Sequence, residues 1–292
     1  MKHLLMKILG LISPMLVTRL LYFKAFHKFL NLKNPINLNE KIQWLKFYGD
    51  TSKWAVESDK YRVREFIREN GLSDILVNLY GQWENTEDLD WNKLPNSFVL
   101  KANHGCGDVV ICKDKNLLDK EATLKYYKEL LATSFGIETG QKHYQLIKPC
   151  LVAEELLDAK QQSVESSSLV DYKFWCINGI PEYVFVCINR TKTNVEVSLY
   201  DTDWKNCSER LVYSDEFRKC GIDIPKPKCF NRMLEVSSIL AKNHPQVRVD
   251  LYEVNAKVYF GELTFTSACG LMTYFSDDLL EELGRKIKLH HK

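Results

Sequence analysis

The fold is decided by two neighbouring stretches, VRVDLY at residues 247–252 and VYFGELTF at residues 258–265. Both are rich in β-branched and aromatic residues, which favour β-strands. Side chains alternate between the two faces of a strand, so only one antiparallel register places the apolar side chains of both stretches on the same face. That register puts Asp250 opposite Glu262, and it predicts a three-residue hairpin loop at residues 255–257.

The predicted hairpin has one apolar face and one polar face. The apolar face is expected to carry Val247, Val249, Leu251, Tyr259, Leu263 and Phe265. The polar face also pairs Arg248 with Thr264. Two ionised carboxylates side by side raise each other's pKa unless a cation lies between them, and carboxylate oxygens on rigid strands suit a magnesium ion that is completed by a nucleotide's phosphates. The alternative is a solvated sheet face with an ordinary ladder of arginine and aspartate.

Length and composition are those of an ordinary globular protein. The 292 residues are enough for a large core and two or three lobes, with 45% hydrophobic and 27% charged residues. A formal net charge of +2 argues against a nucleic-acid binder that relies on a basic surface. The nine cysteines are odd in number and form no C-x-x-C pair, so we expect neither a zinc knuckle nor a full disulfide framework. A reducing cytoplasm is the simpler interpretation of these cysteines.

The first thirty residues differ from the rest. The apolar run LLMKILGLI at residues 4–12 is followed by Pro14 and by three basic residues, Arg19, Lys24 and Lys28. The run is shorter than the roughly 20 residues that span a bilayer, and no cleavage site of a secretory signal follows it. Residues 1–30 are therefore predicted either to lie on a membrane surface or a partner, or to pack as a leading helix on the body.

Sequence patterns predict helices first and mainly strands later. One helix is expected at residues 37–46, with Asn37 or Asn39 as its N-cap, and another from Ser58 to Gly71. A turn-rich stretch at residues 84–96 marks a lobe boundary. Strands are predicted at 98–102, 109–112, 151–153, 172–177, 183–188 and 195–200, with helices near 120–134 and 228–242, and a mobile serine-rich loop at 161–168.

A second group of candidate site residues surrounds the first predicted strand. Lys101 lies on this strand, and the loop at residues 103–108, NHGCGD, leads into the next strand. Two glycines allow backbone N–H groups to approach an anion, and the lysine supplies a positive charge, which predicts phosphate binding. The pattern is neither a Walker loop nor a dinucleotide fingerprint. A glycine-containing hairpin with an incidental lysine is the alternative.

A third group follows the strand at residues 151–153. This strand ends in Glu154 and Glu155, and a later strand begins with Asp171 and Lys173 on one face. Carboxylates at strand ends can accept hydrogen bonds from an adenine amine and from ribose hydroxyls, although solvated strand ends have the same pattern.

Taken in order, these features resemble the ATP-grasp fold, and within it the TupA-like proteins named for teichuronopeptide biosynthesis in bacterial surface-polysaccharide clusters. The resemblance extends from about Leu32 to Gly284. Its marks are NEKIQW at 39–44, DKYRVR at 59–64, LPNSFVLK at 94–101, DYKF at 171–174, RVDLY at 248–252 and GELT at 261–264.

The resemblance implies an α/β (α+β) architecture in which two α/β lobes with antiparallel sheets surround an ATP cleft, preceded by a helical N-terminal segment. The implied parts are the helical segment 1–30, a helical region 31–95, lobe A with the phosphate loop at 96–153, and lobe B with the metal site at 154–292.

The resemblance also implies roles for individual residues. Those expected to bind ATP are Lys101, Gly105, Cys106, Gly107, Glu154, Glu155, Leu156, Leu157, Asp171 and Lys173. The magnesium ligands would be Asp250, Glu262 and Thr264, where many ATP-grasp enzymes have asparagine in place of the threonine. Arg248 and Lys101 would be catalytic through their charge. Lys60 matches a family motif beside a helix start, where a structural role is equally open.

The implied activity is that of an ADP-forming ligase that uses ATP and Mg²⁺ to activate a carboxylate as an acyl phosphate, which an amine then attacks. The absence of a G-x-S-x-G elbow and of a Cys/His nucleophile pair agrees with this chemistry. The expected partners are a uronic or similar acid and an amino acid or other amine, in capsule or surface-glycan assembly on the cytoplasmic side of the cell membrane. Residues 267–270 and Arg190 are expected to contact the acceptor substrate. A glycan phosphotransferase and a non-catalytic interaction protein are the alternatives.

Overall fold

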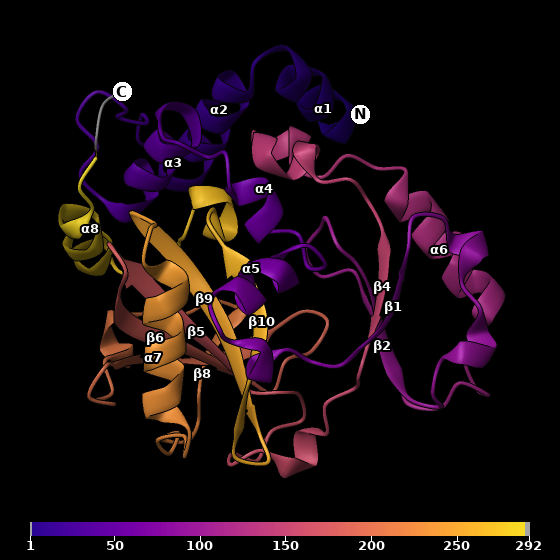
Figure 1. Ribbon diagram of the computed structural model, residues 1–292. Coiled ribbons are helices and arrows are strands. Elements are labelled where there is room, and N and C mark those ends of the chain that lie inside the picture. The colour runs from indigo at the N-terminus through magenta and orange to yellow at the C-terminus, as the bar shows by residue number, and fades with distance from the viewer. Residues whose placement is uncertain (1, 290–292) are drawn as a thin grey trace. The chain divides into compact units, whose positions relative to one another are not determined.

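The computed structural model describes residues 2–289, which form two compact units (Figure 1). Unit 1 comprises residues 2–14 and 52–157, and unit 2 comprises residues 15–51 and 158–289. Each unit has its own β-sheet, and most strand pairs are antiparallel. The predicted α/β architecture with antiparallel sheets is confirmed, whereas the four segments proposed from the sequence stay a prediction.

Unit 1 is built on a four-stranded antiparallel sheet in the order β1-β4-β2-β3. Strands β2 and β3 coincide with the predicted runs. Leu100 on β2 and Tyr127 on helix α6 (Lys120–Leu131) belong to the core that covers this sheet. The Tyr127 hydroxyl donates to the Leu100 carbonyl at 2.7 Å. The elements are α1 (Lys2–Ile12), α4 (Trp54–Glu57), α5 (Val63–Glu69), β1 (Leu79–Trp83), β2 (Phe98–Ala102), β3 (Val109–Cys112), α6 (Lys120–Leu131) and β4 (Leu151–Glu154).

Strand β1 was not predicted, because it lies in the region that the sequence assigned to helices. It is an edge strand that pairs only with β4, and its register shifts between Leu79 and Gly81. An edge strand needs one partner and little burial, so its sequence carries a weak alternation of apolar and polar residues. Its formation depends on β4, which lies about seventy residues later in the chain.

Unit 2 is built on a six-stranded sheet in the order β10-β9-β5-β6-β7-β8, with only β7 and β8 parallel. Helix α7 packs on β5, β6 and β9 (Figure 1). The elements are α2 (Pro14–Phe26), α3 (Leu38–Tyr48), β5 (Asp171–Ile177), β6 (Ile180–Ile188), β7 (Val195–Asp201), β8 (Phe217–Lys219), α7 (Phe230–Ala241), β9 (Gln246–Val254), β10 (Lys257–Thr264) and α8 (Asp277–Lys286).

The hairpin of β9 and β10 has the predicted pairing of Asp250 with Glu262, but the predicted three-residue loop is wrong. The strands are joined by a two-residue turn, in which Asn255 and Ala256 have φ values of 52° and 54°. A β-bulge at Gly261, between Phe260 and Glu262, adds the residue that the register requires.

The bulge also changes which side chains share a face. Phe260 pairs with Leu251 and is buried, whereas Tyr259 pairs with Tyr252 and is only half-buried. The prediction that Tyr259 joins the apolar face is therefore wrong, since the extra residue at the bulge reverses the alternation along β10. The polar face keeps Arg248 opposite Thr264, as predicted.

Helix α3 begins at a capping box. The Asn37 side chain accepts from the Glu40 N–H at 3.0 Å, and the Glu40 carboxylate accepts from the Asn37 N–H at 3.4 Å. This selects Asn37 from the two predicted caps. The other candidate, Asn39, is buried inside the helix.

Two helices cover the first part of the chain. Helix α1 ends at Ile12 and α2 begins at Pro14, whose fixed φ angle suits the first position of a helix. Among the helices in residues 2–289, none combines the length and the apolar character needed to cross a bilayer. The nine cysteines, which all lie within residues 2–289, form no disulfide bond with one another.

Candidate functional site

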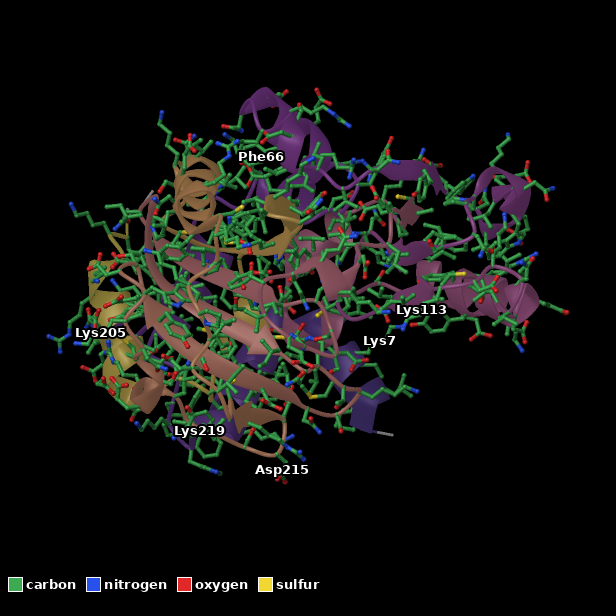
Figure 2. All side chains as sticks on the ribbon, turned by 90° about the horizontal axis from the view of Figure 1, so that it is seen from below. Lys7, Phe66, Lys113, Lys205, Asp215 and Lys219 are labelled. Carbon is green, nitrogen blue, oxygen red and sulfur yellow. The ribbon has the colours of Figure 1, made fainter. Side chains whose placement is uncertain are left out.

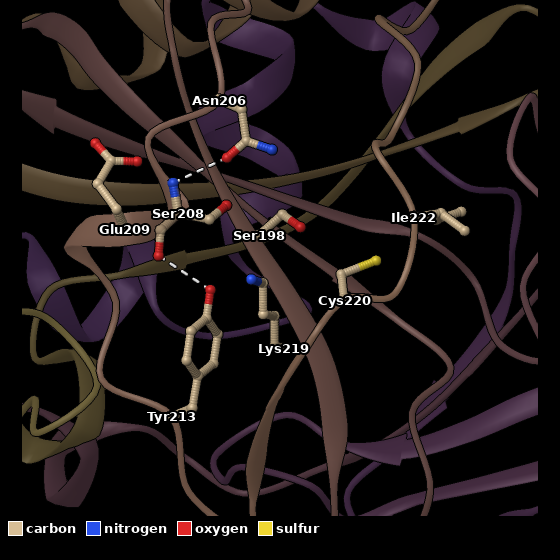
Figure 3. Close-up of a pocket in the computed structure, with 8 residues that line it drawn as sticks. All are labelled: Ser198, Asn206, Ser208, Glu209, Tyr213, Lys219, Cys220 and Ile222. Atoms are coloured by element: carbon tan, nitrogen blue, oxygen red, sulfur yellow. Dashed lines mark hydrogen bonds between the residues drawn. The ribbon is translucent and has the colours of Figure 1, made fainter.

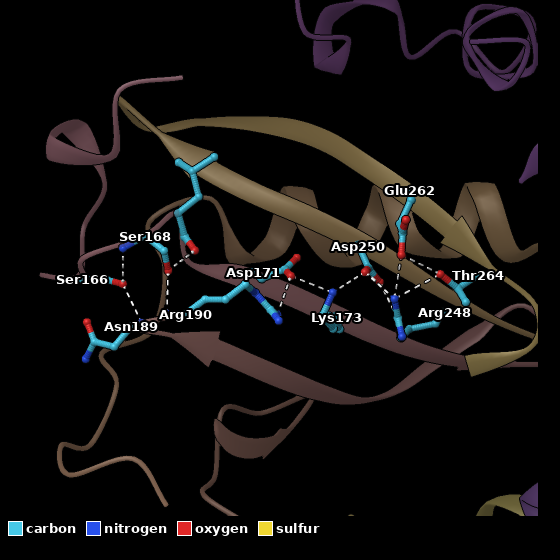
Figure 4. A network of polar contacts seen from close by, with 11 residues as sticks. Ser166, Ser168, Asp171, Lys173, Asn189, Arg190, Arg248, Asp250, Glu262 and Thr264 are labelled. Carbon is cyan, nitrogen blue, oxygen red and sulfur yellow. Dashed lines mark hydrogen bonds and ion pairs between the residues drawn. The ribbon is translucent and has the colours of Figure 1, made fainter. Parts of the chain in front are cut away.

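The polar face of the unit 2 sheet carries a row of charged side chains that we call the acid–base row (Figure 4). Its middle is set by strand register, because Lys173 on β5 lies opposite Asp250 on β9, which lies opposite Glu262 on β10. The row consists of Asp171, Lys173, Arg190, Arg248, Asp250, Glu262 and Thr264. It contains three acids and three bases, so its formal charge is balanced.

Arg248 lies between the two carboxylates of the hairpin. Its Nε and Nη2 atoms donate to the two oxygens of Asp250, both at 2.7 Å. Nη2 also reaches Oε1 of Glu262 at 2.9 Å and Oγ1 of Thr264 at 3.1 Å. The Thr264 hydroxyl donates to the same Glu262 oxygen at 3.0 Å. The guanidinium is therefore the cation that allows Asp250 and Glu262 to lie side by side.

Asp250 is held in its charged form. Burial alone would raise the pKa of this carboxyl, but the charges of Arg248 and Lys173 outweigh burial and lower the pKa. Burial likewise works against the charge on Lys173, yet Asp171 and Asp250 raise its pKa. Lys173 contacts both acids, with Asp171 at 2.7 Å. The result is a buried chain of alternating charges that fixes each side chain in place.

The outer end of the row is more open. Arg190 reaches Asp171 at 3.5 Å and is about half exposed. The other oxygen of Asp171, Oδ1, is buried and has no hydrogen-bond partner among residues 2–289. An unpartnered buried carboxylate oxygen is costly, so this atom is a candidate acceptor for a ligand hydroxyl or amine.

The serine-rich loop at residues 161–168, which was predicted to be mobile, forms hydrogen bonds with the segment at this end of the row. The backbone N–H of Asn189 donates to Ser166 Oγ at 2.9 Å, and that of Arg190 donates to Ser168 Oγ at 3.1 Å (Figure 4). Val164 in the same loop is buried. These contacts connect the loop to the segment that carries Arg190.

The hairpin residues fit a magnesium ion in donor chemistry. Asp250, Glu262 and Thr264 offer oxygen atoms on two paired strands, and the Glu262 side chain is 33% exposed, against 2% for Asp250. Mg²⁺ binds proteins through one or two carboxylates and keeps the remaining positions for water and phosphate. Both Asp250 oxygens accept from cations in this arrangement, so Glu262 is the more accessible ligand. Residues 2–289 hold no group of three or more His, Cys, Asp or Glu side chains placed for a metal.

A strained turn lies next to Arg248. Nη1 of Arg248 is 3.3 Å from the Ser267 hydroxyl, and Ala268, Cys269 and Gly270 follow with φ values of 46°, 60° and 72°. Left-handed backbone at alanine and cysteine costs energy and persists only where other contacts enforce it.

One residue of α3 holds this turn and another holds the residue Met272 just after it, and neither role was predicted from the sequence. Gln43 Nε2 donates to the carbonyls of Cys269 and Gly270 at 2.8 and 3.0 Å. Asn39 accepts from the Met272 N–H at 2.9 Å and donates to its carbonyl at 3.2 Å. Both side chains are buried. The available signal was the i, i+4 spacing of the two amides, which places them on one face of the helix.

The polar residues predicted for unit 1 also meet. Lys101 forms an ion pair with Oε2 of Glu154, and Arg64 lies 3.2 Å from Oε1. Glu154 lies opposite Val99, two positions from Lys101 on β2, so the pair is diagonal across β2 and β4. Burial lowers the pKa of Arg64, although Glu154 counteracts this effect. Arg64 also donates to the Val77 carbonyl at 2.8 Å, and it joins the predicted site as a support for Glu154.

The glycine loop is anchored at its start. Asn103 donates to Asp59 at 2.9 Å, and both side chains are buried. Lys60 Nζ donates to the Gly105 carbonyl, so Lys60 contacts the loop rather than only its own helix start. A side chain at Gly105 would meet the Asp108 carboxylate at 2.8 Å, and Gly107 has a φ of 81°. Gly107 is thus required by the backbone conformation, whereas a Cβ at Gly105 would meet only the movable end of the Asp108 side chain. Cys106 between them is exposed.

The remaining predicted residues of unit 1 lie just after β4. Glu155 is exposed, and its N–H donates to the Asn78 carbonyl at 2.9 Å. Leu156 and Leu157 are half-buried. Their proposed contact with adenine stays a prediction.

A separate hollow of about 320 Å³ lies in unit 2 (Figure 3). Its lining includes Lys219 and Glu209, and the Tyr213 hydroxyl donates to the Ser208 carbonyl at 3.0 Å. None of the predicted site residues lines it. The acid–base row is therefore not part of this hollow.

Comparisons with known proteins give a family match and several solved structures of low sequence identity. The family model described as TupA-like ATPgrasp matches residues 40–288. No curated protein matches the chain. Among solved structures, D-alanine–D-alanine ligase from Bacillus anthracis, complexed with ATP, has a TM-score of 0.41 and 13% identity over 72% of this chain and 55% of its own. L-amino acid ligase from Bacillus licheniformis has a TM-score of 0.47 and 14% identity over 94% of this chain and 60% of its own. The chain therefore spans less than two thirds of these two structures.

Proposed function

The chain belongs to the TupA-like ATP-grasp family, and from this premise we propose that it is an ATP- and Mg²⁺-dependent ligase that joins a carboxylate to an amine. The observation that carries the proposal is the hairpin cluster, in which Arg248 contacts Asp250, Glu262 and Thr264 on two paired strands. Such a cluster combines oxygen ligands for a metal with a cation for a transferring phosphoryl group.

The proposed reaction has two steps. A carboxylate oxygen of the acid attacks the γ-phosphorus of ATP, the bond from this phosphorus to the bridging oxygen breaks, and ADP leaves. The amine nitrogen then attacks the acyl carbon, phosphate leaves, and the amine gives up a proton to solvent. Neither step needs a protein nucleophile, so catalysis rests on positioning and charge.

The residues of unit 1 are proposed to bind the nucleotide. Lys101 neutralises phosphate charge, with Glu154 and Arg64 fixing its position, and the backbone of Gly105, Cys106 and Gly107 donates to phosphate oxygens. Glu154 and the segment Glu155, Leu156 and Leu157 are proposed to contact adenine.

The residues of unit 2 are proposed to bind the metal and to stabilise developing charge. A magnesium ion held by Asp250, Glu262 and Thr264 would supply positive charge to phosphate oxygens. Arg248 adds a fixed cation, and Asp250 keeps its guanidinium oriented. Lys173 is proposed as a further phosphate contact, and Asp171 as an acceptor for ribose hydroxyls.

The proposed substrates follow from the family. We propose a uronic or similar acid and an amino acid or other amine, joined in the cytoplasm during surface-polysaccharide assembly. The strained turn at residues 267–270 and Arg190 are the proposed acceptor contacts, since the turn lies beside Arg248 and Arg190 ends the acid–base row.

The test is a panel of acids and amines incubated with Mg-ATP. A ligase releases ADP and phosphate only when both co-substrates are present, and it forms a hydroxamate when hydroxylamine replaces the amine. Phosphate retained on a sugar hydroxyl would instead identify a phosphotransferase. Failure to bind Mg-ATP in calorimetry, or full activity of Asp250→Asn, would indicate a non-catalytic protein.

Glu262→Gln is the informative variant, because Glu262 is partly exposed and its loss should leave the fold intact. We expect kcat to fall about 100-fold, as the loss of one charged group at a transition state usually causes. The matched control is Glu281→Gln on α8, an exposed glutamate paired with Arg285 at 3.1 Å, which should keep full activity.

A further inference from the structure

Helix α1 presents its apolar stripe to solvent. Leu4, Leu5, Ile8, Leu11 and Ile12 are between 46% and 76% exposed. Their spacing places them on one face of the helix. A helix of a globular protein normally buries such a stripe against the core, so this arrangement is reversed.

The apolar stripe faces solvent because the opposite side of α1 packs on the protein. Gly10 is buried, and a Cβ at this position would lie 2.1 Å from the carbonyl oxygen of Ile137. The helix therefore packs on the short turn Ile137–Thr139 of its own unit through a glycine, where the backbones approach closely. The expectation that a leading helix packs on the body is met by α1, but the side that packs is opposite the exposed apolar stripe.

Helix α2, in the other unit, shows the same pattern on a smaller scale. Leu16, Leu20 and Phe23 are spaced i, i+4 and i+7 and are each about 45% exposed, while Val17, Thr18 and Tyr22 on the opposite side are buried. The exposed Arg19 and Lys24 flank this stripe. Long basic side chains beside an apolar stripe can keep their charges in water while their stems cover apolar surface.

The charge of residues 1–39 indicates which kind of partner binds the exposed stripes of α1 and α2. Residues 1–39 contain six lysines and arginines and no acidic residue, so the rest of the chain carries more acids than bases. Lys7, Arg19, Lys24, Lys28 and Lys33 are all exposed, and Lys7 is labelled in Figure 2. A second copy of the same face would bring like charges together. An anionic lipid surface instead complements both the apolar stripes and the basic side chains.

We propose that α1 and α2 each bind the surface of an anionic membrane, with their apolar stripes at the boundary of headgroups and acyl chains and their basic side chains at lipid phosphates. The helices have 11 and 13 residues, so they lie on the bilayer and do not cross it. This binding does not depend on the proposed ligase activity, and it brings the protein to the membrane reversibly.

The test is flotation of the full chain with vesicles. We expect binding to vesicles of phosphatidylcholine and phosphatidylglycerol in equal parts, little binding to phosphatidylcholine alone, and release at high salt. The triple variant Leu4→Gln, Ile8→Gln and Leu11→Gln should bind about ten-fold more weakly or worse. Arg19→Ala and Lys24→Ala should each weaken binding about five-fold at low salt.

The matched control replaces three isolated exposed apolar residues elsewhere, Leu117→Gln, Leu146→Gln and Ile180→Gln, which are each more than 60% exposed. This variant should bind like the unaltered protein. All variants change exposed positions, so circular dichroism and thermal unfolding should be unchanged. The proposal is overturned if the unaltered chain fails to bind anionic vesicles, if both triple variants bind equally, or if light scattering shows a dimer that the α1 variant converts to a monomer.

Discussion

Arg248 explains how two carboxylates can occupy neighbouring positions on paired strands. Its guanidinium contacts both, and its bidentate pair with Asp250 leaves Nη2 in contact with Glu262. From the sequence we predicted a magnesium ion at these acids, with an ordinary ladder of arginine and aspartate as the alternative. In the structure an arginine side chain contacts both acids, and the magnesium site stays a prediction. A metal bound there would have to share Glu262 with Arg248, which links metal binding to the position of the guanidinium.

Lys46 on α3 gives a prediction at the same scale. It is buried, donates to the Thr18 hydroxyl at 2.9 Å, and burial lowers its pKa to about 7. In the unfolded chain a lysine titrates near 10.4. Between these values the unfolded chain binds the additional proton, so the Lys46 contribution to the free energy of unfolding rises with pH by about 1.4 kcal/mol per unit and is flat below pH 7.

Lys46→Met should therefore be more stable than the unaltered protein at pH 7, by a few kcal/mol, and this advantage should shrink towards pH 10. Urea unfolding at several pH values measures the difference. The matched control is Lys125→Met, which replaces a lysine at an exposed position on α6. A constant difference for Lys46→Met would contradict the prediction.

At the scale of elements, the β9–β10 hairpin shows how a register is achieved. For Asp250 to lie opposite Glu262, the connection between the two strands must contain an odd number of unpaired residues. A three-residue loop is one way to meet this requirement. The molecule uses a two-residue turn and a bulge at Gly261 instead. A Cβ at Gly261 would lie 3.0 Å from the Asp250 carbonyl oxygen, so the bulge brings the backbone of β10 close to the site.

The turn itself can be tested with Ala256→Gly. Ala256 has a φ of 54°, a conformation that costs a residue with a Cβ about 1–2 kcal/mol, while glycine adds about 0.5–1 kcal/mol of entropy to the unfolded chain. We expect a net gain in stability of about 0.5–1 kcal/mol, seen as slower hydrogen exchange in β9 and β10.

In the control variant, the same replacement of alanine by glycine is expected to lower stability. Ala122→Gly at an exposed position of α6 should lower stability by about 1 kcal/mol, because glycine is a poor helix former. Faster exchange in β9 and β10 of Ala256→Gly would show that the turn does not tolerate glycine.

At the scale of the whole molecule, the chain is divided into two units that are not continuous in sequence. Residues 15–51 belong with residues 158–289, although all of unit 1 after residue 51 lies between them. The connection is made by α3, whose Gln43 binds the turn beside Arg248 and whose Asn39 binds Met272 just after this turn. The stability of the acid–base row thus depends on a helix from an early part of the chain.

Separate cores predict separate unfolding. Phe98 on β2 is fully buried in unit 1, and its replacement by alanine should cost about 3–5 kcal/mol. Hydrogen exchange should accelerate in β2, β3 and β4 and stay slow in β5, β6 and β9. Phe174→Ala on β5, also fully buried, should give the converse pattern. Equal loss of protection in both sheets would mean that the units unfold together.

The amino-acid sequence is enough to locate most of the strands, with β1 and β8 as exceptions, and to pair Asp250 with Glu262, because side chains alternate along a strand with a period of two. It also identified Lys101, Glu154 and the glycine loop as neighbours of a strand end. The tertiary structure alone decided how the register is achieved, since the bulge at Gly261 depends on the opposite strand.

The tertiary structure also decided which distant groups support the site. Arg64 reaches Glu154 and Gln43 reaches Cys269 through hydrogen bonds between segments far apart in the chain. A buried amide or guanidinium has no periodic signature that names its partner, because the partner is set by packing. The outward direction of the α1 stripe has the same origin, since it follows from the contact of Gly10 with Ile137 and not from the apolar pattern itself.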